Sequence, residues 1–178
     1  MSKKYELSFV LGRFQVFHNG HKSIIEEALK ISEKAVILVG SSSESRTKKN
    51  PFTFEERKRV IEECFQNVKI VSLKDIGVGD CEIWGDYLIE NVSNVFDKKP
   101  EVFVCGNDSK VDKWFSDEAL KSLKIFKIDR KILNTSASEL RSAIIENNKE
   151  YFCKNTPLAV HKYYDFYKDT LKNIEQNT

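Results

Sequence analysis

Short apolar runs alternate with amphipathic segments along most of this chain. The apolar runs, typical of buried strands, cover residues 7–11, 35–39, 68–73, 101–105 and 124–128. The amphipathic segments, typical of helices, follow the first run near residue 20 and cover residues 53–65, 84–96 and 140–145. Because parallel strands need long crossovers and lie in sheets covered on both faces, this alternation predicts an α/β fold with a Rossmann-like, doubly wound parallel sheet.

Length and composition predict one domain. The chain has 178 residues, of which 40% are hydrophobic, and this is enough for a substantial core. We therefore expect a single domain over residues 1–178, with residues 151–178 as a helical C-terminal extension rich in aromatic side chains. These are Tyr163, Tyr164, Phe166 and Tyr167. The oligomeric state stays open, and a homo-oligomer is compatible with the sequence.

The balance of charges excludes a broad nucleic-acid surface. Lys and Arg number 29 against 27 Asp and Glu, so the net charge is only +2 and an anion site must be local. The first apolar run is short and is preceded by Glu6, which does not fit a signal peptide or a membrane span. We expect a cytoplasmic protein with neither a nucleic-acid nor a membrane partner.

The cysteines and acids predict no protein-bound metal. Cys64, Cys81, Cys105 and Cys153 are widely spaced without a CxxC pair, which argues against a zinc site and a disulfide framework. We expect them to be reduced and mostly in the core. No cluster of carboxylates in the sequence suggests a dedicated cation cage, so we assign no metal ligands.

Two of the three histidines stand three residues apart between the first strand and the first helix. The segment reads Gly12-Arg13-Phe14-Gln15-Val16-Phe17-His18-Asn19-Gly20-His21. Imidazoles with this spacing lie on one side of a helix start, where unpaired N–H groups and the helix dipole favour an anion. Gly20 leaves out a Cβ where a ligand would come close to the backbone. The segment therefore predicts a phosphate site.

Two further polar segments precede helices and carry capping boxes. Thr53 and Glu56 form one within residues 45–57, and Ser136 and Glu139 form another within residues 134–141. Arg141 follows in the first turns of the second helix, where the helix dipole favours an acid. A cation is tolerated there more easily if a polyphosphate lies beside it.

Together these segments resemble the HxGH nucleotidyltransferases, and in particular the nicotinamide mononucleotide (NMN) adenylyltransferases of archaeal and bacterial type. The first matches GRFQxFHxGH, residues 45–57 are similar to S-x-x-x-R/H-T-x-x-N-P-F-T-x-x-E-R, and residues 134–141 are similar to IS-x-T-x-x-R. The chain departs from the family at Val16, where proline is usual, and at Ser138, where threonine is usual. The resemblance covers residues 5–147.

The resemblance implies transfer of the AMP moiety of ATP to NMN, which gives NAD and pyrophosphate. It implies catalytic contacts for His18, His21 and Arg141, with the imidazoles donating to the α-phosphate and the bridging oxygen. It implies contacts to ATP and its phosphates for Gly12, Arg13, Phe14, Gly20, Ser136 and Ser138. It implies contacts to NMN for Arg46, Trp84 and Asn107. Mg²⁺ is expected as a cofactor carried by ATP.

The expected preference for NMN depends on the loop before the third helix. The family keeps a tryptophan at the position similar to Trp84, and an indole face favours the cationic pyridinium of nicotinamide. Asp80 and Glu82 stand near this tryptophan and disfavour the carboxylate of nicotinate. The loop is longer than is usual in the family, and Cys81 stands where asparagine is often found.

Two alternatives stay open. A pantetheine-phosphate adenylyltransferase or a cytidylyltransferase would share the HNGH turn, but would need neither the long match over residues 45–57 nor Trp84. A nucleotide-sensing module would keep the binding site without turnover. The presence of His18, His21 and Arg141 argues against the sensor.

Overall fold

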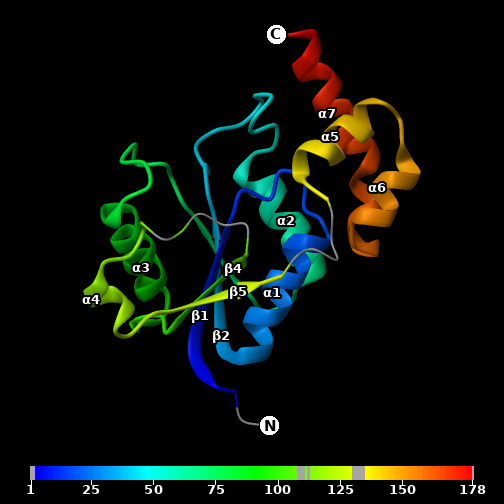
Figure 1. Ribbon diagram of the computed structural model, residues 1–178. Helices are drawn as coiled ribbons and strands as arrows, with labels where there is room; N and C mark the ends of the chain where they lie inside the picture. The colour runs from blue at the N-terminus through cyan, green and yellow to red at the C-terminus, as the bar shows by residue number, and fades with distance from the viewer. Residues whose placement is uncertain (1–2, 108–110, 112, 130–134, 178) are drawn as a thin grey trace.

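A five-stranded parallel sheet forms the centre of the described structure. The computed structural model describes residues 3–107, 111, 113–129 and 135–177. Among these residues the strands are β1 (Tyr5–Gly12), β2 (Ser32–Val39), β3 (Lys69–Ser72), β4 (Val102–Gly106) and β5 (Lys124–Ile128). They lie in the order β3-β2-β1-β4-β5, and every pairing is parallel. Figure 1 shows the sheet with helices on either side of it. The predicted doubly wound α/β fold is confirmed.

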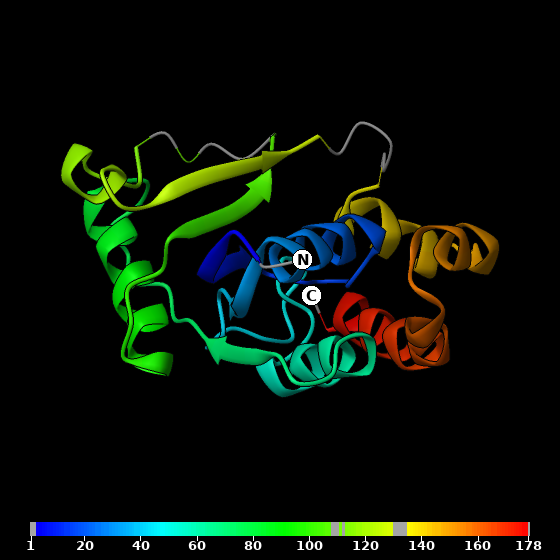
Figure 2. The ribbon, with the colours of Figure 1, turned by 90° about the horizontal axis from the view of Figure 1, so that it is seen from below.

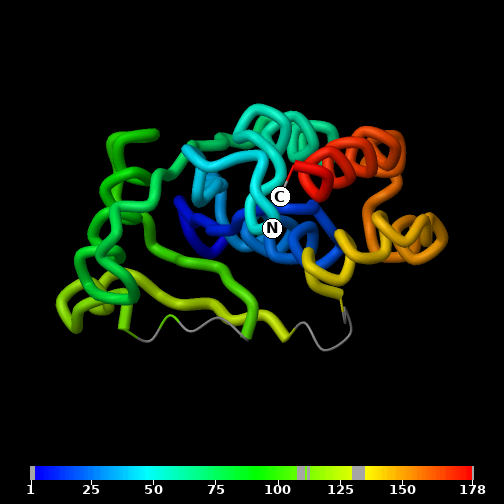
Figure 3. The backbone as a smooth tube through the Cα atoms, turned by 90° about the horizontal axis from the view of Figure 1, so that it is seen from above, coloured from blue at the N-terminus to red at the C-terminus, as the bar shows by residue number. Residues whose placement is uncertain are grey.

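Helices cover both faces of the sheet. One face carries α1 (Asn19–Ile31), α2 (Phe54–Cys64), α5 (Ala137–Ile145), α6 (Lys149–Asn155) and α7 (Tyr164–Gln176). The other carries α3 (Glu82–Phe96) and the short α4 (Asp117–Leu120). Figures 2 and 3 show the two groups of helices on opposite sides of the strands. Successive side chains of a strand point to opposite faces of the sheet, so β1 contributes to both cores. Phe9 belongs to the cluster with α3, and Val10 belongs to the cluster with α1.

Local sequence signals account for most helix starts. The side chain of Thr53 accepts from the backbone N–H of Glu56, and the carboxylate of Glu56 accepts from the backbone N–H of Thr53, so the predicted capping box opens α2. Ser136 and Glu139 do the same for α5. The third helix starts at Glu82, two residues earlier than expected.

The C-terminal segment, which was expected to be helical, consists of separate helical pieces. It forms α6, a 3₁₀ segment η1 (Leu158–Tyr163) and α7. The break lies at Thr156 and Pro157, because proline lacks an N–H and disfavours helical backbone in the residue before it. Phe152 and Tyr167 belong to the same buried cluster as Val10 of β1. The segment is therefore part of the core that covers one face of the sheet.

The cysteines and the helices give two further results. All four cysteines are free, and three of them belong to or pack against the core, as expected. Cys105 is buried in one core cluster, Cys64 and Cys153 are partly buried against the other, and Cys81 belongs to neither. Within the described part of the chain, no helix combines the length and the apolar character needed to cross a membrane.

Candidate active site

A pocket of about 330 Å³ lies at the carboxyl ends of β1, β2 and β4. The strand order reverses between β1 and β4, and open α/β sheets bind ligands at such a switch point. One group of lining residues is polar or presents backbone, and comprises Gly12, Arg13, His21, Gly40, Ser41 and Asp75. A second group is apolar, and includes Trp84, Phe103, Val111 and Trp114. The lining can therefore take a molecule that combines an anionic group with a flat ring.

The two predicted histidines meet at the start of α1. His18 caps the helix, and its Nδ1 accepts from the backbone N–H of Gly20 at 3.1 Å. This bond keeps the ring proton on Nε2 in the neutral imidazole. The His18 and His21 rings stack with centroids 3.7 Å apart, and His21 lines the pocket. The prediction that both imidazoles project from one side of the helix start is confirmed.

Gly12 and Phe14 shape the turn before the histidines. Phe14 is buried and has a φ of 54°, and its ring folds back over the end of β1. A Cβ at Gly12 would lie 2.9 Å from this ring, so glycine is required for the close approach. The same ring packs edge-on against His21, with centroids 4.8 Å apart. Gly12 and Phe14 thus support the His21 imidazole, while Arg13 is exposed at the pocket.

Arg141 reaches the histidine turn from the other end of the chain. Its guanidinium donates to the backbone oxygen of Gln15 and, at 3.1 Å, to Oγ of Ser138. Burial and the nearby charge of Arg13 lower the pKa of Arg141, so two cations share this region. Such a pair favours a bound polyphosphate. Ser136 is engaged in the capping box of α5, and Asn134 of the same motif lies outside the described residues.

Arg57 is a site-forming residue that the sequence analysis left without a role. Its guanidinium is almost fully buried and donates to four backbone oxygens, those of Arg13, Gly40, Ser41 and Thr53, at 2.7–3.1 Å. Burial, aided by the charge of Arg13, lowers the pKa of Arg57 to about 10. The side chain ties the ends of β1 and β2 to α2 beneath the pocket. The ER pair at the end of the 45–57 motif was its only signal in the sequence.

A second tryptophan joins Trp84 in the pocket. The Trp84 and Trp114 rings stand at 88° with centroids 6.3 Å apart, and Trp114 stacks on Phe103 of β4. No sequence pattern predicted a role for Trp114, because in the sequence it is only an aromatic residue some positions after β4. Asn107 was predicted beside NMN, but its side chain donates to Asp129 at 3.1 Å and it is not among the lining residues.

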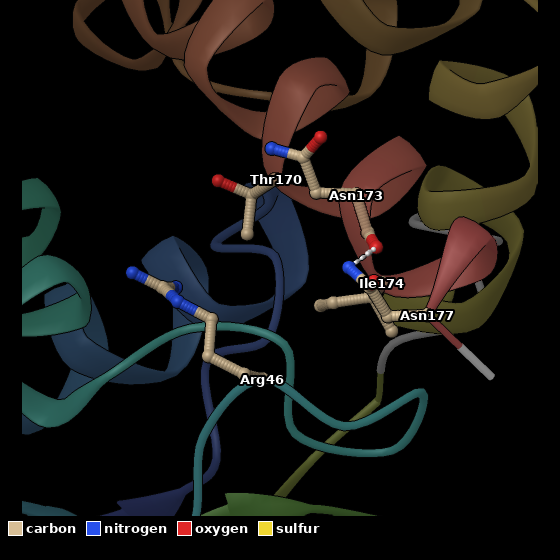
Figure 4. A pocket seen from close by; sticks show the side chains of 5 residues that line it. All are labelled: Arg46, Thr170, Asn173, Ile174 and Asn177. Atoms are coloured by element: carbon tan, nitrogen blue, oxygen red, sulfur yellow. Dashed lines mark hydrogen bonds between the residues drawn. The ribbon is translucent and has the colours of Figure 1, made fainter.

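Arg46 lies at a different pocket. Its guanidinium donates to Glu56 and to the backbone oxygen of Pro51, and the bond to Glu56 raises the pKa of Arg46. Figure 4 shows it facing α7, with the other residues that line this pocket of about 360 Å³. They are Thr170, Asn173, Ile174 and Asn177. The structure therefore does not bring Arg46 to Trp84, and its contact with NMN stays a prediction.

Comparison with known proteins places the chain in a family. Residues 9–166 match the cytidylyltransferase-like family. The chain belongs to this family. It is 28% identical over 163 residues to the nicotinamide-nucleotide adenylyltransferase of Picrophilus torridus, with 89% of each chain covered. It is 41% identical over 85 residues to the enzyme of the same name from Saccharolobus solfataricus, with 46% of this chain and 45% of that one covered.

A solved structure of a related protein has the same fold. It is a bifunctional NMN adenylyltransferase/ADP ribose pyrophosphatase from Francisella tularensis in complex with AMP and a Mn ion. The match has a TM-score of 0.74 and 28% identity, and it covers 97% of this chain and 53% of the other. This chain therefore spans about half of that bifunctional protein. The resemblance to NMN adenylyltransferases inferred from the motifs is confirmed.

Proposed function

We propose that this protein is a nicotinamide-nucleotide adenylyltransferase, which transfers AMP from ATP to NMN and releases pyrophosphate. The observation that carries the proposal is the pocket itself. It sets His21 and Arg13 beside the ends of β1 and β2, and two tryptophans on the neighbouring wall. A nucleotide phosphate fits the first group of residues, and a cationic pyridinium fits the second. Curated relatives with this activity support the same reading.

The reaction needs positioning more than covalent help. An oxygen of the NMN 5′-phosphate attacks the α-phosphorus of ATP, the new P–O bond forms, and the bond to the β-phosphate oxygen breaks. The electron pair of that bond leaves with pyrophosphate. The Nε2–H of His18 and the ring of His21 would donate to the α-phosphate and the bridging oxygen, where negative charge grows.

The leaving pyrophosphate requires cations that stay in place. Arg141 is held by the Gln15 carbonyl and by Ser138, which fixes its guanidinium beside the histidine turn. Ser136 opens α5, whose N-terminus favours an anion. We assign the β- and γ-phosphates to this group. The substrate is MgATP, so Mg²⁺ enters with the triphosphate, and the cytoplasm is the expected location of the reaction.

An assay of purified protein tests the proposal. ATP with Mg²⁺ is offered together with NMN, nicotinate mononucleotide or phosphopantetheine, and CTP replaces ATP in a parallel series. Pyrophosphate release and the dinucleotide product are measured. We expect turnover with ATP and NMN above all other pairs. Preference for phosphopantetheine or for CTP would replace the proposal by another transferase activity, and binding without turnover with every pair would indicate a nucleotide sensor.

A further inference from the structure

Trp114 forms one wall of the pocket, and it belongs to a segment outside the hydrogen-bonded strand β4. It lies beyond the end of β4, which closes at Gly106, and its backbone N–H bonds to the oxygen of Val111 at 3.1 Å. One face of the indole packs on Phe103, with an angle of 27° between the rings. Trp84 packs against the same indole at 88°, and both rings line the pocket. The position of this ring therefore decides how wide the aromatic part of the pocket is.

Helix α3 packs directly against the backbone of Trp114 at Gly85. A Cβ built at Gly85 would lie 1.7 Å from the Trp114 carbonyl oxygen, so this position of α3 accepts no side chain. The contact sets the distance between the α3 backbone, which carries Trp84, and the backbone of Trp114. It does not set the rotation of the Trp114 ring about its own side-chain bonds.

Asp80 supplies the missing constraint. Its Oδ1 accepts the indole N–H of Trp114 at 2.8 Å, across 34 positions of sequence. Stacking on Phe103 alone lets an indole slide and turn in its own plane, because an apolar contact has no direction. A hydrogen bond at Nε1 is directional and fixes that remaining freedom. Asp80 is exposed and is not among the lining residues, so it acts on the pocket through Trp114.

The loop that carries Asp80 is tied to the pocket at both ends. At its start, Oγ of Ser41 donates to Asp75 at 2.8 Å, and at its end Asp80 accepts from Trp114. Between them Gly77 and Gly79 have φ values of 73° and 70°, and a Cβ built at either would meet no atom within 4 Å. The middle of the loop therefore makes few contacts at these positions. The bond at Asp80 joins this loop to the aromatic wall.

We propose that Asp80 is a positioning residue that holds Trp114 in place as the second aromatic wall, and thereby sets the affinity for the pyridinium ring of the mononucleotide. The inference rests on the proposed function, and it adds a residue that contacts neither ATP nor the reacting phosphates. Its loss should weaken mononucleotide binding and leave the chemical step and ATP binding unchanged.

Intrinsic fluorescence measures this directly, because both tryptophans of the chain line the pocket. A pyridinium ring that stacks on an indole quenches its emission, so titration with NMN alone yields a dissociation constant. We expect Asp80→Ala to raise this constant about five- to tenfold, the loss of roughly one hydrogen bond. Asp80→Asn keeps an acceptor oxygen for Nε1 and should stay within about twofold of the wild type.

Two further variants separate positioning from a general effect on the fold. Asp86→Ala removes an exposed carboxylate from α3 and should bind NMN like the wild type. Trp114→Phe keeps an aromatic ring but removes the donor, so adding Asp80→Ala to it should cost nothing more. Melting temperatures of all variants are measured alongside. An Asp80→Ala variant that binds NMN like the wild type, or a double variant weaker than Trp114→Phe alone, overturns the inference.

Steady-state kinetics keep the inference distinct from the proposed function. In the wild type, NAD formation from ATP and NMN tests the function itself. In Asp80→Ala we expect a raised KM for NMN with kcat and the KM for ATP unchanged. A wild type that forms NAD while Asp80→Ala lowers only kcat would contradict the positioning role and leave the function standing. A wild type without quenching by NMN and without NAD formation would overturn both.

Discussion

At the scale of single residues, the candidate site depends on donors whose positions are set by their neighbours. His21 is supported by stacking on His18 and by the edge of Phe14. We expect His21→Ala to lower kcat about 10²–10³-fold, the usual loss when one donor to the transition state is removed. The melting temperature should change little, because His21 is partly exposed at the pocket. Near-normal turnover in a folded variant would remove His21 from the mechanism.

Trp84 distinguishes the NMN assignment from other transferases with the same phosphate machinery. A cationic ring stacked on an indole is worth about 1–2 kcal/mol, so Trp84→Ala should raise the KM for NMN about tenfold and leave ATP unaffected. A tryptophan with only a packing role would instead cost about 3–5 kcal/mol of stability and impair both substrates. Both KM values and a melting curve of this variant decide between the two roles.

Arg57 holds the backbone at the ends of β1 and β2, beside the pocket. We expect Arg57→Lys to lower the free energy of unfolding by about 1–3 kcal/mol, because one ammonium cannot serve all four carbonyl oxygens and leaves buried acceptors unpaired. Arg59→Lys is the matched control, since Arg59 is exposed on the same helix. Urea unfolding of the two variants measures the difference. Equal stability of both would show that the four bonds contribute nothing.

At the scale of elements, the start of α2 has a stability that depends on pH. Burial opposes ionisation of Glu56, but the bonds from Arg46 and from the Thr53 backbone outweigh it and lower its pKa below the ordinary 4.5. A carboxyl with a lowered pKa stabilises the folded state fully above its ordinary pKa and loses this contribution as the pH falls through the lowered one. The window of loss therefore lies below about pH 4.5.

Glu56→Gln should therefore destabilise the protein at pH 7 and much less at acidic pH. Half-exposed ion pairs contribute about 0.2–1 kcal/mol, which corresponds to a shift in Tm of at most about 4 °C for a chain of this length. Glu55→Gln removes an exposed carboxylate from the same first turn and serves as the control. Melting curves between pH 3 and pH 7 test this, and a deficit that does not shrink on acidification would contradict it.

At the scale of the whole molecule, the C-terminal segment and the site share one core. Phe152 is fully buried and contacts Tyr164 and Tyr167, with ring centroids 5.2 and 6.1 Å away. We expect Phe152→Ala to lower the free energy of unfolding by about 3–5 kcal/mol. On denaturation of this variant, the sheet and the C-terminal helices should unfold in one transition. Phe126→Ala, at a residue of β5 that is 39% exposed, should change the free energy of unfolding by less than about 1 kcal/mol. Separate transitions by tryptophan fluorescence and circular dichroism would show an independent extension.

The sequence by itself determined the features that depend on near neighbours. The alternation of strands and helices, the capping boxes at Thr53 and Ser136 and the histidine pair at the start of α1 all rest on contacts within about four residues. Their periodicity and residue types are visible in any short window. The family resemblance depends on the same local segments, so it can be found from the sequence alone.

Only the tertiary structure decided which distant side chains meet. Arg141 contacts Gln15 across 126 positions, Arg57 joins the ends of β1 and β2, and Trp114 comes to Trp84 through a contact with Gly85. Arg46 donates to Glu56 and lies beside α7, and it is not at the pocket lined by Trp84 and Trp114. The order β3-β2-β1-β4-β5 brings these segments together at the carboxyl ends of the strands, and no local pattern specifies that order. The histidine turn and the helix caps could therefore be predicted from short motifs, whereas the aromatic pocket depends on how the helices pack against the sheet.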